Sequence, residues 1–246
     1  MLWARRAEQC PHAPTVLALA AEREISQANE LLSGVENWDR EGEELAKVAS
    51  AHQRRMRRAH DWLQAAIDES ARRGSLPPPE TYYYRAYALT TMGDNDAAAV
   101  AVAEAATHRD VADHRLQRMS ALVHLFAGDL KTSLRLAHRA VIDAPDGDRL
   151  ISRYIYALVL DRAGALHSAA QEFKSLQRES GRHAARLAVE SVLPVHERLF
   201  LRALDHQVAE RHAHASRVWE QYLSREEPEE PERVLARRHR AELDPR

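Results

Sequence analysis

The stretch GDNDAAAVAVAEAA, residues 93–106, contains a helix boundary followed by a helix made almost wholly of alanine and valine. Gly93-Asp94 ends one helix and opens the next, because glycine readily terminates helices. A helix with such short side chains lets other backbones approach closely. We therefore expect 97–106 to be a packing helix whose two faces both touch neighbouring helices.

The same boundary recurs along the chain. Gly128-Asp129 lies 35 residues after Gly93, and Gly164-Ala165 lies 36 residues after Gly128. When the copies are aligned on glycine, small residues recur where two helices of one unit must cross closely. These are Ala86, Ala121 and Ala157 seven before it, and Ala98, Ser133 and Ala169 five after it; Ala105, Ala140 and Leu176 stand twelve after it. Larger side chains, Val102 and Phe173, stand nine after it and are expected to fill the space towards the next unit.

A fourth, weaker copy has Glu210 in place of the glycine. Ala203 stands seven before it, and Ala215, Trp219 and Tyr222 stand five, nine and twelve after it. The 46-residue gap from Gly164 to Glu210 exceeds one repeat. The spacing therefore predicts an inserted helix at about 182–193, ending before Pro194.

This pattern resembles the tetratricopeptide repeat (TPR), a helix-turn-helix unit of about 34 residues. The resemblance covers roughly 79–228, with three clear repeats and one degenerate repeat. It departs from the family at the first helices, which lack the usual tryptophan, and at the insertion. It implies an all-α fold, a right-handed α-solenoid of TPR-like repeats, and no stretch shows the apolar/polar alternation of strands.

The remaining segments are predicted to flank the array. Residues 1–74 are expected to form a helical hairpin or cap, with helices at 14–33 and about 39–73, ended by the prolines of 75–79. Residues 229–246 are expected to form a C-terminal capping helix and tail, with a solvated polar helix at 232–243. The acidic run 225–232 is interpreted as a linker.

The composition of the chain excludes or disfavours several classes of function. The 35 basic and 37 acidic residues nearly cancel, which disfavours nucleic-acid binding. A lone Cys10 excludes an internal disulfide framework, and no apolar run is long enough to span a bilayer. The start of the chain lacks the apolar core of a secretory signal, which favours a cytoplasmic protein; a secreted or lipid-anchored protein whose signal has been removed stays open. The alanine and arginine bias indicates a GC-rich, bacterial genome.

Motifs for chemistry are weak. His206, Glu210 and His214 share a four-residue spacing, but the span crosses the turn predicted at 210–212, so scattered surface histidines are the favoured interpretation. The aromatic stretch 81–87 could stack on single-stranded bases, although repeat packing accounts for it better. No nucleotide-binding, zinc-protease or serine-hydrolase motif is present. We therefore predict no catalytic residue, no metal and no cofactor.

Where the TPR family binds peptides or helices, the first helices of the repeats line a concave groove. The resemblance implies that three rows of residues line it here: Tyr83, Arg118, Tyr154 and Phe200; Tyr87, Leu122, Leu158 and Leu204; and Thr90, Leu125, Asp161 and Gln207. Family members that clamp chaperone tails use Lys and Asn at such places, which this chain lacks. The largely apolar rows suit an amphipathic helix or an extended peptide of a partner protein. In the alternative, the chain's own inserted or N-terminal helices fill the groove.

The sequence therefore predicts a non-catalytic scaffold or adaptor that binds a partner protein. A peptide-responsive regulatory sensor is the alternative, and a metal-using enzyme is the third hypothesis. The identity of the partner and the oligomeric state, including a homo-oligomer, stay open.

Overall fold

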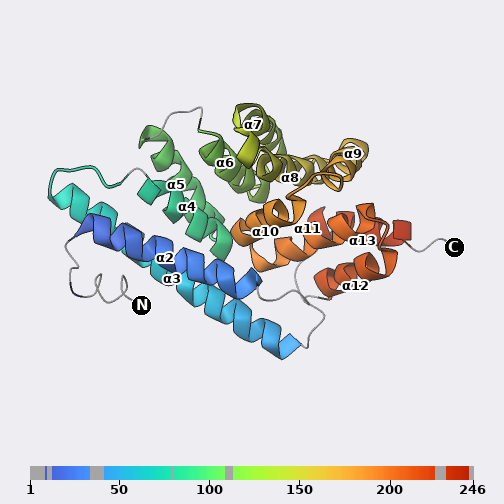
Figure 1. Ribbon diagram of the computed structural model, residues 1–246, viewed down its shortest axis with the longest axis horizontal. Coiled ribbons are helices and arrows are strands. Elements are labelled where there is room, and N and C mark those ends of the chain that lie inside the picture. The colour runs from blue at the N-terminus through green and yellow to red at the C-terminus, as the bar shows by residue number, and fades with distance from the viewer. Residues whose placement is uncertain are drawn as a thin grey trace. The chain divides into compact units, whose positions relative to one another are not determined.

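A computed structural model describes residues 9, 13–33, 42–78, 80–108, 113–224 and 231–243. This part of the chain is all-α: it consists of helices and their connections, without strands (Figure 1). The chain divides into two compact units, Met1–Val123 and His124–Arg246, and the boundary falls within helix α6 (His114–Phe126). Each unit is described by itself.

The first unit begins with two long helices. Helices α2 (Pro14–Ser33) and α3 (Gly42–Arg72) pack side by side (Figure 1), α3 packs on α4 (Glu80–Met92), and α4 packs on α5 (Asn95–His108). Leu17 and Ala20 of α2 meet Ala66 of α3 in a buried cluster. Both helices predicted within 1–74 are confirmed, although the expected start near residue 39 lies outside the described residues.

The second unit contains seven further helices in its described part. They are α7 (Leu130–Asp143), α8 (Asp146–Arg162), α9 (Leu166–Leu176), α10 (Arg182–Val192), α11 (Val195–Val208), α12 (His212–Leu223) and α13 (Pro231–Leu243). Neighbours along the chain pack as α7 on α8, α8 on α9, α11 on α12, and α12 on α13, while α10 packs against α8. The predicted inserted helix is confirmed as α10, which buries Ala185, Val189 and Val192 and stops before Pro194.

The turns between paired helices share one backbone geometry. Gly93, Gly128 and Gly164 have φ of 80°, 77° and 78°, in the left-handed region that favours glycine. At each turn the glycine N–H donates to the carbonyl three residues back, and the next N–H donates to the carbonyl five residues back. This is the Schellman arrangement, which satisfies carbonyls at the end of the first helix.

The fourth turn has the same arrangement without glycine. Glu210 has a φ of 58°, its N–H donates to the Gln207 carbonyl at 3.0 Å, and the Arg211 N–H donates to the His206 carbonyl at 2.9 Å. Among the described residues, Glu210 is the one residue other than glycine with a positive φ. The predicted alignment of Glu210 with the turn glycines is therefore confirmed.

The small residues aligned on these turns are buried as expected. Their exposed fractions are 0% or 1%, which applies to Ala86, Ala121, Ala157, Ala203, Ala98, Ser133, Ala169 and Ala215. In the pairs α4–α5, α8–α9 and α11–α12 the two helices pack on each other. Short side chains at these positions let the backbones approach.

One expectation for α5 is wrong. Ala98, Ala101 and Ala105 are fully buried, but Ala99 is exposed and Val100 is 55% exposed, so only one face of α5 packs on other helices. Alanine on the open face is explained by its high intrinsic helix propensity, which needs no packing partner. The smoothness of 97–106 thus reflects close packing on one side and local helix preference on the other.

Candidate functional site

The twelve residues predicted to line a groove are mostly covered. Tyr83 and Gln207 are partly exposed. The other ten are at most 8% exposed: Tyr87, Thr90, Arg118, Leu122, Leu125, Tyr154, Leu158, Asp161, Phe200 and Leu204. In this conformation these side chains offer little surface to a partner, and their role in binding stays a prediction.

In the first unit the chain's own helix α2 covers part of α4. The Asn29 side-chain amide donates a hydrogen bond to the Tyr87 hydroxyl at 3.0 Å. One turn earlier, the Tyr84 hydroxyl donates to Glu22 at 3.2 Å. Burial, followed by the neighbouring Glu22 carboxylate, raises the pKa of Tyr84 to about 12. These contacts hold α2 over the side of α4 that carries Tyr87.

In the second unit helix α13 covers three of the predicted residues. The His239 imidazole of α13 lies with Nε2 3.0 Å from Oδ1 of Asp161 and with its ring 6.3 Å, centroid to centroid, from Phe200. The same ring stacks on Trp219 with centroids 5.4 Å apart and planes inclined by 2°. Gln207 donates to Glu242 of α13 at 3.5 Å. A helix of the chain therefore lies where the sequence predicted a partner helix.

Ion pairs attach α13 near both of its ends. Glu232 pairs with Arg162 at 3.4 Å, and Arg240 pairs with Glu220 at 2.8 Å. The buried residues of α13 are Arg233, Ala236 and His239, of which only Ala236 is apolar. The predicted C-terminal helix is confirmed, but the prediction that it is simply solvated is wrong, because one face is buried.

Aromatic side chains gather beneath α13. The Phe200 ring makes edge contacts with Trp219 and Tyr222, at centroid distances of 4.9 Å and 5.4 Å. The Arg162 guanidinium lies over the Phe200 ring, with Cζ 3.9 Å from the centroid. Large aromatic groups beside a polar fringe are typical of surfaces that bind helices. Here α13 occupies this surface.

The inserted helix α10 packs on a helix that carries two more of the residues predicted to line the groove. Tyr154 and Leu158 belong to α8, against which α10 packs. Tyr154 is 1% exposed, and its ring meets the Phe173 ring at a centroid distance of 6.2 Å. Burial first, and then the nearby Asp205 carboxylate, raise the pKa of Tyr154 to about 12.

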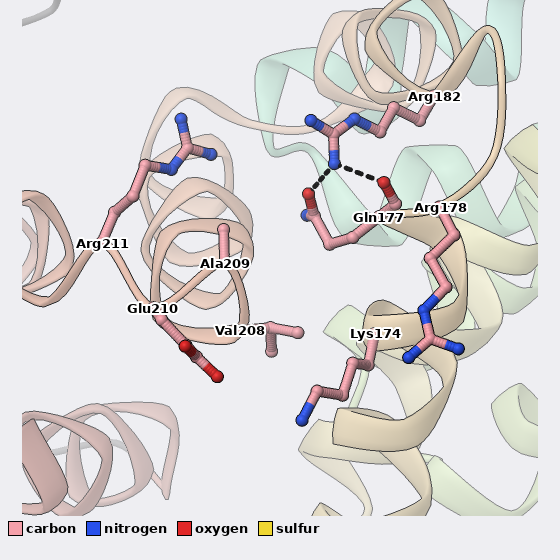
Figure 2. A pocket seen from close by; sticks show the side chains of 8 residues that line it. All are labelled: Lys174, Gln177, Arg178, Arg182, Val208, Ala209, Glu210 and Arg211. Atoms are coloured by element: carbon pink, nitrogen blue, oxygen red, sulfur yellow. Dashed lines mark hydrogen bonds between the residues drawn. The ribbon is translucent and has the colours of Figure 1, made fainter.

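An open pocket of about 450 Å³ lies elsewhere in the second unit, and half of the residues that line it are cationic (Figure 2). We call it the basic pocket. Its walls come from the end of α9 and the following turn, the start of α10, and the α11–α12 turn. The lining residues are Lys174, Gln177, Arg178, Arg182, Val208, Ala209, Glu210 and Arg211. Four of them are cationic and one is acidic, so the lining has a positive charge.

A buried carboxylate organises one wall of the basic pocket. Asp205 is 7% exposed; it accepts a hydrogen bond from Gln177 at 2.5 Å and lies 3.5 Å from Arg211. Arg182 in turn donates to the Gln177 carbonyl at 2.7 Å and also to its side-chain oxygen (Figure 2). Burial raises the pKa of Asp205, although the cations around it act in the opposite direction.

Two cations of the basic pocket are available to a ligand. Lys174 and Arg178 are both exposed, and neither has an ion-pair partner within the described part of the chain. The positive surroundings also act on His206, whose pKa is lowered to about 4 by burial first and then by Arg211, His214, Arg186 and Arg202. The pocket is therefore suited to a negatively charged group.

The candidate metal ligands His206, Glu210 and His214 lie around the turn between α11 and α12. The predicted turn does separate His206 from His214, since α11 ends at Val208 and α12 begins at His212. The two imidazole rings nevertheless lie 5.6 Å apart, centroid to centroid. Across the described residues, no group of three or more His, Cys, Asp or Glu side chains is arranged to hold a metal ion.

Sequence reasoning did not find the basic pocket. Three of its cations, Lys174, Arg178 and Arg182, recur every four residues, but the fourth, Arg211, comes from a distant turn, so the sequence did not show that they line one pocket. Two signals were present, however: the insertion near 182–193 and the replacement of glycine by Glu210. Both departures from the repeat pattern border this pocket.

Comparisons with known proteins give no family assignment. No protein-family model matches the sequence, and no curated protein matches it significantly. In the described residues, no helix is both long enough and apolar enough to cross a membrane.

Proposed function

We propose that this chain is a non-catalytic adaptor, built as a right-handed solenoid of TPR-like helix pairs, that binds a segment of a partner protein in the cytoplasm. The observation that carries the proposal is the fourfold recurrence of one turn geometry at Gly93, Gly128, Gly164 and Glu210. Repeated helix pairs of this kind stack into extended surfaces, and such surfaces commonly bind other proteins.

The contacts of α13 support a helix-binding role for the second unit. Asp161, Phe200 and Gln207 belong to the rows that the resemblance assigns to partner binding, and all three contact α13. A surface of aromatic rings and carboxylates that holds one polar helix is chemically suited to hold another. A partner that uses this surface has to replace α13.

Affinity capture with variants of α13 tests the proposal. His239→Glu places a carboxylate against Asp161 and should release α13, whereas Ala241→Glu adds the same group on an exposed position of the same helix. Wild type and both variants are immobilised after their helicity has been checked by circular dichroism. Proteins retained from a lysate of the source cell are then quantified by mass spectrometry.

We expect one protein to be retained by the wild type, to be enriched by His239→Glu, and to be unchanged by Ala241→Glu. If none of the three forms retains a protein above the level of an unrelated helical control, the adaptor proposal is wrong. A purified chain that turned over a substrate would also contradict it.

A peptide-responsive sensor is the second candidate, because α13 is held by polar contacts that a ligand can exchange. In that case a free peptide that replaces α13 should change the surroundings of Trp219, which is fully buried and stacks on His239 of α13. The measurement is a shift of tryptophan fluorescence together with faster hydrogen exchange across 231–243. An adaptor that binds only a partner protein should show neither change with free peptides.

A further inference from the structure

We infer that the basic pocket is an anion-binding site that receives a phosphorylated side chain, or closely spaced carboxylates, on a segment of the partner protein. The inference deepens the proposed function and rests on it, since it takes the ligand to be part of another protein. It concerns a surface distinct from the one beneath α13.

The charges favour an oxyanion over any other ligand. Lys174, Arg178, Arg182 and Arg211 line the pocket against the single carboxylate of Glu210. Guanidinium groups present planar forks of N–H donors that match the oxygens of phosphate and carboxylate. A cavity of about 450 Å³ is large enough for such a group together with the adjoining peptide.

Some of these donors are held in place and others can move. Asp205 is buried beneath the wall and fixes Gln177 and Arg211, and Gln177 fixes Arg182. Lys174 and Arg178 have no ion-pair partner in the described chain and are free to turn towards a ligand. A preorganised wall lowers the entropic cost of binding, and mobile cations can close over the anion.

The backbone adds to the same potential. Helix α12 begins at His212, and its N-cap residue, Arg211, lines the pocket without a side-chain hydrogen bond to the helix. An uncapped helix N-terminus carries partial positive charge from its free N–H groups. This feature reinforces the cluster of cations and does not define the site alone.

Local irregularity also points to this place. Glu210 adopts a φ of 58°, which costs an L-residue free energy that glycine would avoid. The inserted helix α10 begins at Arg182, also in the pocket wall. Departures from a regular pattern, when they coincide in space, are expected at functional sites.

The test is a binding titration with defined peptides and the full chain. Three peptides share one glycine-rich sequence and carry phosphoserine, two adjacent glutamates, or serine at the centre. Isothermal titration at low salt gives the affinities, and NMR chemical-shift changes give the location. We expect the phosphoserine or glutamate peptide to bind about tenfold or more tightly than the serine peptide, because charge-assisted hydrogen bonds are lost with serine.

A matched pair of double variants distinguishes binding at the pocket from a general effect of the protein's net charge. Lys174→Glu with Arg178→Glu reverses two cations of the pocket, and Lys131→Glu with Arg135→Glu reverses two exposed cations on α7 at the same spacing. Both double variants change the net charge equally. Only the pocket variant should lose binding, again by about tenfold or more, with helicity unchanged by circular dichroism.

The inference is overturned if no anionic peptide binds the wild type, or if both double variants weaken binding equally. It is also overturned if the shifted resonances lie away from 174–182 and 208–211, a readout that requires no substitution. The tighter of the two anionic peptides identifies whether phosphate or carboxylate is the recognised group.

The titration tests the anion site and the capture experiment tests the adaptor proposal, so either proposal can fail without the other. If peptides bind at the pocket but no cellular protein is retained, the adaptor proposal is wrong and the anion site stands as a property of the chain. If a protein is retained equally by wild type and by the Lys174→Glu, Arg178→Glu variant, the adaptor proposal stands and the pocket has no part in it.

Discussion

At Glu210 a side chain with a Cβ atom occupies the left-handed backbone conformation that the equivalent turns give to glycine. For L-residues this conformation costs about 1–2 kcal/mol relative to ordinary helical geometry. The turn keeps both Schellman hydrogen bonds, so the strain is tolerated rather than relieved. The free energy of unfolding should therefore change measurably when this one residue is substituted.

Glu210→Gly is expected to raise the free energy of unfolding by about 1 kcal/mol, because glycine adopts the positive φ without strain. Urea denaturation followed by circular dichroism measures the change. Gly128→Ala is the converse test: a Cβ there meets no atom within 4 Å, so only the φ of 77° opposes it. It should destabilise by about 1 kcal/mol. Stabilisation by alanine at position 128 would contradict the turn geometry.

His206 should make the second unit sensitive to acid. Its pKa of about 4 in the folded state is below the ordinary value of 6.5, so the unfolded chain binds the proton more readily. The stability contributed by neutral His206 is present above pH 6.5 and is lost as the pH falls towards 4. His206→Gln should reduce the loss of stability between pH 7 and pH 5 by roughly 1 kcal/mol, allowing for partial solvent screening.

Urea midpoints at the two pH values give this difference, with His167→Gln as the control. His167 is exposed on α9, and its imidazole contacts Gln171 within the same helix. A decrease of acid sensitivity that is equal in both variants would show that the burial of His206 is not its cause.

At the scale of elements, helix α5 offers two adjacent alanines in opposite surroundings. Ala98 is fully buried where α4 and α5 pack, and Ala99 is exposed. Ala98→Leu should destabilise the chain by about 1–3 kcal/mol through overpacking. Ala99→Leu should change stability by less than about 0.5 kcal/mol. Equal effects, measured by thermal unfolding, would contradict the packing of this helix pair.

Helix α13 is expected to open more easily than the helices it covers. It buries little apolar surface, and its exposed ion pair between Arg240 and Glu220 is weakened by salt. His239→Ala leaves the buried Asp161 carboxylate without its imidazole partner, a loss of about 1–3 kcal/mol. Amide exchange across 231–243 should then accelerate about tenfold or more, and raising the salt concentration should accelerate it in the wild type.

Exchange within α8 serves as the internal reference. If 231–243 exchanges as slowly as the centre of α8 in wild type and variant alike, α13 is an integral part of the core. It would then not be a helix that a partner or a peptide can replace.

The helix pairs could be predicted because their signals are local. Glycine at the turn and alanine five residues after it act within one unit, so their spacing alone aligned the copies, including the one with Glu210. The surroundings of the predicted groove residues could not be predicted. Whether Asp161 faces a partner or His239 depends on a contact across 78 residues, and neither residue type nor spacing encodes it. The basic pocket was missed for the same reason.

At the scale of the whole molecule, the two compact units should respond to substitutions independently. Ala98→Leu lies in Met1–Val123 and Glu210→Gly lies in His124–Arg246. Residues without shared partners normally have additive effects on stability, to within about 0.5 kcal/mol. The double variant should therefore show the sum of the two single changes in urea denaturation.

The pair His239→Ala and Asp161→Asn provides the contrast, because these side chains are in direct contact. Their double-variant cycle should give a coupling energy of about 0.5 kcal/mol or more. Strong coupling between positions 98 and 210 would instead contradict the expected independence of the two positions.

The Glu210 side chain has a consequence for ligand choice as well. Its carboxylate is the one acidic group among the residues that line the basic pocket, so it repels an incoming anion that the four cations attract. If the pocket binds anions as proposed, a doubly charged group gains more from the four cations than a singly charged group does, and it can better offset the repulsion from Glu210. We therefore expect the pocket to favour doubly charged groups over chloride and single carboxylates.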